Sequence, residues 1–327
     1  MERVALYGDF GALYWHGIIL AFAIAAAVFL FCVLRIMQNG KLTGALWIAA
    51  VSIPAGIVIA RLVYWLHRQD QYEGVKDAFL KMSDGGYCLF GAAAGVVIVI
   101  IIFCLFSKEK ALLKTFDAAA PAAALGICIG RLAAFFSTSD RGKIVENHKL
   151  KRLPFAIWEP AQERWGVAVF IFEAAAALVI CVITVVIFTL TYSKLGKNRR
   201  QGDTALIFIL LYCSAQCVLE SLRDDSLYFI VLGFVRISQV YSAVLVFAVL
   251  VIMSIRVLKK YGFKPVMPCV WAVCLALLGI AFYMELRMTS EVYVRNYVIM
   301  TACMAVVALT GFVMYALTAK NADIDKS

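Results

Sequence analysis

Long apolar runs separated by short charged segments dominate the pattern of this chain. Each run is long enough for a helix to cross the roughly 30 Å hydrocarbon core of a bilayer. We place these runs at 12–34, 44–66, 88–106, 118–137, 166–192, 204–222, 236–256, 267–284 and 297–318. The pattern therefore predicts nine membrane-spanning helices.

The composition identifies the environment of these helices. Hydrophobic residues make up 64% of the chain, whereas soluble domains contain about 45–50% apolar residues. Because continuous apolar runs of this length are typical of helices rather than of barrel strands, we expect an all-α integral membrane protein. The net charge of +10 does not indicate nucleic-acid binding, since the basic residues lie in short loops between the runs.

The loops also predict an orientation. Those after the first, third, fifth and seventh runs are rich in Lys and Arg, which the positive-inside rule assigns to the cytoplasm. We therefore expect the N-terminus outside and the tail 319–327 in the cytoplasm. The loop 138–165 is also basic and argues against this orientation. This loop and the loop 67–87 are long enough to be amphipathic or to lie on the membrane.

Charged and polar side chains gather at one depth, which is the outer end in this orientation. They are His16, Arg61, Arg131, Glu173, Glu220, Arg223, Arg236 and Gln239. A charge inside the bilayer costs about 3 kcal/mol or more unless it is paired or used. Arg131 alone could be an arginine that snorkels from a helix end, but scattered snorkelling would not select one side. The common depth favours a functional site.

Arginines and carboxylates of this set can pair. We expect the pairs Arg131–Glu173 and Glu220–Arg223. The residues of the second pair are three apart in the sequence and share a helix face. The second pair could equally be a simple ion pair at the end of its span. Several arginines beside a leaflet suit a phosphate, which guanidinium binds bidentately. A phospholipid head group is therefore the expected ligand, and neither a channel ring nor a midplane transport site is visible.

The ten cysteines do not suggest a metal site. Nearly all lie inside apolar runs, and no CxxC pair occurs. They are most simply small packing residues, so we expect no metal and no other cofactor.

A series of segments carries a family resemblance over about residues 10–257. They are YWHGIIL, GIVIARLVYWL, DGGYCLFGAAAG, FDAAAPAAALGICIGRLAAFF, VFIFEAAAAL, VLESLRDD and LGFVRISQVYS. In this order they resemble motifs of the prolipoprotein diacylglyceryl transferase family. The most specific is the fourth, which is similar to the signature Asp…Ala-Pro…Gly-x-x-Ile-Gly-Arg-Ile-Gly-Asn-Phe.

The resemblance implies a multi-pass enzyme of the bacterial cytoplasmic (inner) membrane, with its site facing the outer leaflet. It would transfer a diacylglyceryl group from phosphatidylglycerol, or another anionic phospholipid, to the lipobox cysteine in the signal peptide of a prolipoprotein. This chemistry needs a base for the thiol and cations for the leaving phosphate. The candidate catalytic residues are His16, Arg131 and Glu173, and the candidate substrate-binding residues are Arg61, Arg131, Glu220, Arg223 and Gln239.

Several polar positions depart from the family's pattern. The histidine of the third segment is Phe90, the asparagine after the Gly-Arg signature is Ala134, and an arginine four residues before Glu220 is Gln216. His16 stands where the family has tyrosine and is a candidate replacement base, although an interfacial histidine can also be an ordinary hydrogen-bonded residue. The other two histidines, His67 and His148, fall in loops.

Two functions follow from the same bundle. The first is the transferase, and the alternative is a catalytically degenerate relative that binds a lipid or a partner. We divide the chain into a seven-span transferase-like domain, 1–257, and a C-terminal extension, 258–327, which holds two further spans and a short cytoplasmic tail.

Overall fold

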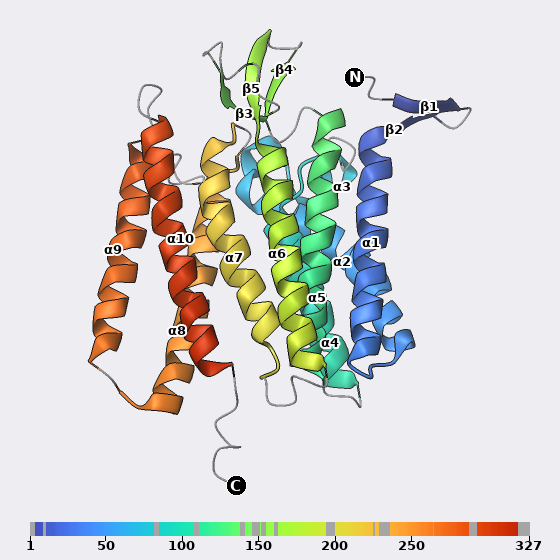
Figure 1. Ribbon diagram of the computed structural model, residues 1–327. Coiled ribbons are helices and arrows are strands. Elements are labelled where there is room, and N and C mark those ends of the chain that lie inside the picture. The colour runs from blue at the N-terminus through green and yellow to red at the C-terminus, as the bar shows by residue number, and fades with distance from the viewer. Residues whose placement is uncertain are drawn as a thin grey trace.

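The computed structural model describes residues 4–8, 11–81, 85–107, 111–137, 141–145, 151, 155–159, 163–193, 200–224, 226–228, 236–263, 265–287 and 293–319. Nine helices in this part of the chain are long and apolar enough to cross a membrane, which confirms the predicted all-α membrane fold. They are α1 (Trp15–Met37), α2 (Leu42–His67), α4 (Leu89–Phe106), α5 (Leu112–Leu132), α6 (Val169–Tyr192), α7 (Asp203–Leu219), α8 (Ile237–Tyr261), α9 (Val266–Leu286) and α10 (Tyr293–Thr318). Figure 1 shows them as one upright bundle with α1 and α9 at opposite edges. His148 and the tail beyond residue 319 lie outside the described residues.

Several helices begin a few residues away from the predicted starts, and two of these differences have a clear cause. The run 118–137 belongs to a helix that already begins at Leu112, followed by a 3-10 helix, Ala133–Phe136. The earlier start has a physical cause, since the charged Asp117 is fully buried. Its carboxylate accepts the backbone N–H groups of Gly202 and Ala205 at 2.6 and 3.0 Å, and so satisfies the first turn of α7. The run 166–192 begins as a helix only at Val169, because the residues before it form a strand.

Small residues let the helices approach closely. A Cβ added at Gly91 would lie 2.8 Å from the backbone of Ala60, and one at Gly95 would lie 2.8 Å from the carbonyl oxygen of Ala55. Both glycines therefore allow α4 to pack directly on α2. Gly126 likewise allows α5 to pack closely on α1, because a Cβ added there would lie 3.1 Å from the Cβ of Ala27.

Short strands cover the end of the bundle at which α1 begins (Figure 1). The strands β1 (Val4–Gly8) and β2 (Gly11–Tyr14) form an antiparallel hairpin. The loop 138–165, expected as a possible surface-lying segment, instead contributes β3 (Arg141–Ile144) and β4 (Ala156–Glu159), which flank β5 (Arg164–Ala168) in one antiparallel sheet. Trp158 and Trp165 face each other across β4 and β5 with ring centroids 5.8 Å apart, so their rings form a cross-strand pair. The loop 67–87 contains a 3-10 turn, Gln69–Gln71, and the short helix α3 (Val75–Leu80).

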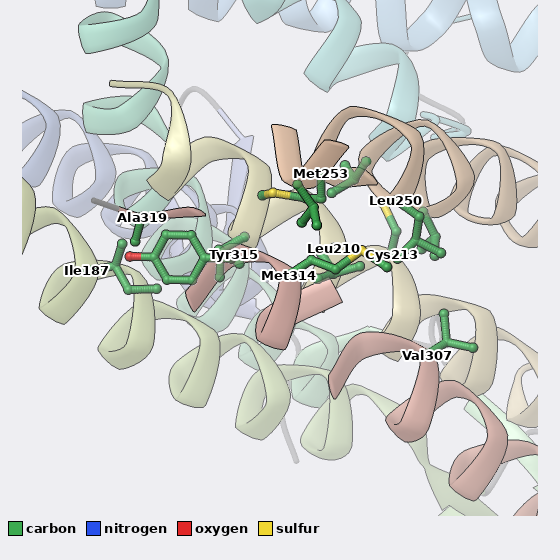
Figure 2. Close-up of a cluster of buried hydrophobic side chains, with 13 residues drawn as sticks. Ile187, Leu210, Cys213, Leu250, Met253, Val307, Met314, Tyr315 and Ala319 are labelled. Carbon is green, nitrogen blue, oxygen red and sulfur yellow. The ribbon is translucent and has the colours of Figure 1, made fainter. Parts of the chain in front are cut away.

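A large apolar core holds the later helices together. Figure 2 shows Leu210 and Cys213 of α7, Leu250 and Met253 of α8, and Met314 of α10 converging on one cluster. Because lipid is as apolar as leucine, this association depends on close packing rather than on exclusion of water. The last helix is therefore an integral part of the bundle.

Candidate functional site

The predicted site residues lie at the same end of the bundle, the end that carries the strands (Figure 1). His16 lies in the first turn of α1, Arg61 in the last two turns of α2, Arg131 at the end of α5, Glu173 in the second turn of α6, Glu220 and Arg223 directly after α7, and Gln239 in the first turn of α8. The common depth inferred from the sequence is thus a property of the structure.

Glu173 lies between two arginines and forms the centre of this site. Its Oε2 is 3.2 Å from Nη1 of Arg131, which confirms the predicted pair, and its Oε1 is 3.5 Å from Nη1 of Arg223. The Glu173 side chain is only 2% exposed, and each arginine side chain is 14% exposed. Tyr212 of α7 lies close to both Arg131 and Glu173. One carboxylate thus balances one of two guanidinium charges, and the three groups together remain cationic.

The small sheet fixes the position of Arg223. Gly142 of β3 forms an antiparallel bridge with Arg223, and Arg164 of β5 pairs with Asp224 at 3.3 Å. A Cβ at Gly142 would lie 2.7 Å from the carbonyl oxygen of Leu222, so this contact requires glycine. The sheet therefore holds the segment after α7 against the arginine cluster.

Glu220 has a different partner from the one expected. The carboxylate is buried and accepts a hydrogen bond from Nε2 of Gln216 at 2.9 Å. After α7 the chain makes one 3-10 turn, Glu220–Leu222, and Arg223 is already extended. The helical spacing assumed for Glu220 and Arg223 therefore does not continue, and Arg223 reaches Glu173 instead.

Arg61 is fully buried and holds the loop between α2 and α4. Its Nε donates to the carbonyl of Ala78, its Nη2 to that of Lys81, and its Nη1 to those of Gly85 and Gly86. The guanidinium also lies 5.2–5.7 Å from the ring centres of three tyrosines, Tyr64, Tyr72 and Tyr87. Every nitrogen of Arg61 thus donates to backbone, so the geometry gives this arginine a structural place beside the site.

His16 contacts the turn that follows Arg131. Its Nδ1 is 3.1 Å from the carbonyl oxygen of Ala133. Because a carbonyl only accepts, Nδ1 carries the proton, and in the neutral ring Nε2 is then the acceptor. Gln239 joins α8 to the end of α7 by hydrogen bonds. Its Nε2 donates to the carbonyl of Cys217 at 3.1 Å and to the hydroxyl of Ser221 at 2.8 Å.

Comparison with known proteins gives this arrangement a context. The model of the prolipoprotein diacylglyceryl transferase family matches residues 4–255, which include α1 to α7 and most of α8. The chain belongs to this family. A phosphatidylglycerol–prolipoprotein diacylglyceryl transferase of Lactococcus lactis subsp. lactis is 28% identical over 80% of this chain and 96% of its own length. The transferases of the same name from Finegoldia magna and Clostridium botulinum are 29% and 25% identical over 80% and 74% of this chain, and 97% and 93% of their own lengths.

Phe90, one of the positions expected from the sequence to depart from the family motifs, lies in an aromatic cluster. Phe90 packs edge-on against Tyr241 of α8, with centroids 5.7 Å apart. The Tyr241 hydroxyl lies 2.8 Å from Nε2 of His67. The sequence placed His67 in a loop, whereas it is the last residue of α2. The only sequence signal for this helical position is that His67 directly follows the apolar run 44–66. Its contact with Tyr241 is tertiary, so no local pattern could have predicted it.

A second group that sequence reasoning missed comes from α9, beyond the family match. Glu285 pairs with Nη1 of Arg236 at the start of α8, and its other oxygen accepts from the hydroxyl of Ser221. Ser221 is also the acceptor for Gln239, so α9 joins the polar end of the family domain. Within the described residues, no group of three or more His, Cys, Asp or Glu side chains could hold a metal ion.

Proposed function

We propose that this chain transfers a diacylglyceryl group from phosphatidylglycerol to the lipobox cysteine of prolipoproteins. Family membership supports the reaction class. The observation that carries the proposal is the buried cluster of Arg131, Glu173 and Arg223, which is cationic and lies at one end of a membrane bundle. A phosphate diester at a leaflet surface is the anion that two guanidinium groups at this depth fit.

The reaction is a substitution at the glycerol carbon that bears the phosphate. The thiol proton passes to a base, the thiolate sulfur forms a bond with this carbon, and the carbon–oxygen bond to the phosphate breaks. The electron pair of that bond leaves with glycerol phosphate, whose charge the arginines stabilise. Arg131 contacts the phosphate, Arg223 contributes the second guanidinium, and Glu173 fixes the direction of both.

The other site residues support this pair. Arg61 shapes the site by holding the loop that precedes α4, because its nitrogens are occupied by backbone carbonyls. Glu220 and Gln216 form a buried hydrogen-bonded unit at the end of α7, and Gln239 fixes α8 to α7. All three position the substrate-binding end of the bundle.

His16 is the base in this proposal. The carbonyl of Ala133 orients the ring and leaves Nε2 as the proton acceptor. His67 is the competing base, but its Nε2 already faces the Tyr241 hydroxyl. His16 is therefore preferred, because its hydrogen bond to Ala133 is made by Nδ1 and not by the acceptor nitrogen.

The location follows from the reaction. We place the N-terminus and the charged end at the outer leaflet of the bacterial cytoplasmic membrane, where the signal peptide of a prolipoprotein emerges. The basic loops at the opposite end support this orientation. We also retain residues 258–327 as an extension of the transferase-like domain 1–257, because the family match ends at residue 255.

One observation favours the alternative, a relative that binds phospholipid without transfer. Phe90 and Ala134 are apolar residues at positions where the family motifs carry histidine and asparagine, and Ala134 is buried. A lipid site that retained its arginines and lost its base would still bind an anionic phospholipid.

The deciding experiment supplies purified protein in nanodiscs with phosphatidylglycerol and a lipobox peptide, and detects the peptide by mass spectrometry. The proposal predicts a thioether-linked diacylglyceryl adduct, and none when phosphatidylcholine replaces phosphatidylglycerol or serine replaces the peptide cysteine. Binding of phosphatidylglycerol without any adduct would instead establish the lipid-binding alternative.

A further inference from the structure

The two helices beyond the family match are packed tightly onto it. Met314 and Tyr315 of α10 lie in the core shared with α7 and α8 (Figure 2). A Cβ at Gly311 would lie 2.6 Å from a methyl carbon of Leu210. The end of α9 is also tied to the first turn of α10, because Asn296 is buried and donates to the carbonyl of Arg287 at 2.9 Å. The hairpin therefore holds its own site-facing residues in fixed positions.

Those residues include Glu285, whose two oxygens are both engaged. One pairs with Nη1 of Arg236 and the other accepts from Ser221, which in turn accepts from Gln239 at 2.8 Å. Ser221 directly follows Glu220, so this network adjoins the predicted site. The side chains of Arg236 and Glu285 are only 10% and 17% exposed, so water screens their pair weakly.

One donor of Arg236 has no acceptor within the part of the chain that the structure describes. The residue is 8% exposed, and its Nε is buried with no acceptor among the residues that the structure describes. A buried guanidinium N–H without an acceptor is unfavourable unless a ligand supplies one. Its face also lies 5.7 Å from the ring centre of Tyr228, which limits the directions open to an acceptor.

The network lies near the arginine cluster around Glu173. Tyr297 of α10 lies within electrostatic range of both Glu173 and Glu285. Lys143 of β3 lies at the same corner, where burial and then the charge of Arg236 lower its pKa, and the charges of Glu285 and Asp224 oppose this effect. Two cationic side chains, Lys143 and Arg236, thus lie at this corner beside the carboxylates of Glu285 and Asp224.

We propose that the C-terminal hairpin completes the anion-binding end of the site, with Glu285 as a positioning residue that directs Arg236 toward a phosphate ester. This rests on the proposed function only in taking phosphatidylglycerol as the lipid that carries this group. Arg236 binds the phosphate in the ground state, so its loss weakens substrate binding more than it slows the chemical step.

The test compares Glu285→Gln, Arg236→Gln and their double variant with Arg287→Gln as the control. Arg287 is an exposed charged residue near the same end of α9, where its Nε donates to the hydroxyl of Tyr283. The KM for phosphatidylglycerol in nanodiscs should rise about tenfold or more in each single variant, with kcat changed less, and should stay unchanged in Arg287→Gln. Because the two residues act as one unit, the double variant should be no worse than Arg236→Gln. The KM of Glu285→Asp should lie between those of the wild type and Glu285→Gln, because aspartate keeps the carboxylate.

Binding separates this proposal from the reaction itself. Equilibrium binding of phosphatidylglycerol in nanodiscs and of soluble glycerol phosphate is measured on the same proteins, whether or not any peptide is modified. Weaker binding of either phosphate ester by Glu285→Gln supports the proposal even if the wild-type protein makes no adduct, and the two probes distinguish a lipid from its head group. Unchanged binding and KM together with a lowered melting temperature would assign Glu285 a merely structural part and overturn it, as would losses that multiply in the double variant.

Discussion

Replacing Glu173 with glutamine tests the arginine cluster most sharply. At separations of 3.2 and 3.5 Å and an effective dielectric constant of about 20, each pair has a Coulomb energy of about 5 kcal/mol. Desolvation offsets most of this, and removing one partner of a buried ion pair typically costs about 3–5 kcal/mol. With an unfolding entropy of about 2.1 cal/mol/K per residue, a chain of 327 residues shifts by about 1.5 °C per kcal/mol, so the apparent melting temperature should fall by roughly 4–8 °C.

The assay is thermal unfolding in nanodiscs, with Asp77→Asn as the matched control. Asp77 also pairs with a cation, Lys81, at 2.9 Å, but its side chain is 24% exposed and that of the lysine 52%. Such a pair contributes about 0.3–0.5 kcal/mol, so the control should melt within about 2 °C of the wild type. Equal melting temperatures for Glu173→Gln and the control would refute the reasoning.

A compensated variant separates stability from function. Replacing a buried ionic group as a whole by apolar residues is often neutral or stabilising. The triple change Glu173→Leu, Arg131→Met and Arg223→Met should therefore regain most of the melting temperature and have no transfer activity. Recovery of activity in this variant would exclude the cluster from the reaction.

Three further outcomes are expected. His16→Ala should slow transfer by about 10²–10⁴-fold, the usual contribution of a general base, with phosphatidylglycerol binding unchanged; the same loss in His67→Ala alone would move the base to that residue. Gly142→Ala should slow transfer about tenfold or more. The added Cβ would lie 2.5 Å from a side-chain carbon of α6 and would displace Arg223. A wild-type rate in a kinetic assay of this variant would contradict the expectation. Asp117→Asn should cost about 1.5–3 kcal/mol in thermal unfolding without changing transfer per folded molecule, since it lies at the opposite end of the bundle.

The polar end of the bundle could be predicted from the sequence because a charge in lipid is costly wherever it lies. Arg131 and Glu173 fell at one depth in neighbouring spans, and this was enough to predict their contact. The predicted limits of a membrane span were wrong where a charged residue is buried inside the bundle and not exposed at its end. Asp117 directly precedes the predicted run 118–137, but the N–H groups at the start of α7 satisfy its carboxylate inside the bundle.

The remaining contacts depended on information that local patterns do not carry. The partner of Arg223 changed because the helix ends before it, and helical spacing cannot show where a helix stops. Arg61 looked like a ligand contact until the carbonyls of a later loop were seen around it. Glu285 and Arg236 are 49 residues apart, and only the packing of α9 and α10 on the core brings them together.

The central claim is that the arginine cluster binds the donor phosphate and supports transfer, and one comparison tests it directly. Transfer from phosphatidylglycerol to a lipobox peptide is measured for the wild type and Arg131→Ala, with lipid binding measured on the same nanodiscs. The account predicts that the wild type forms the thioether adduct and that the variant binds the lipid more weakly and transfers about 10²–10³-fold more slowly, as expected for the loss of one group that stabilises the leaving charge. Transfer at the wild-type rate by Arg131→Ala would contradict it.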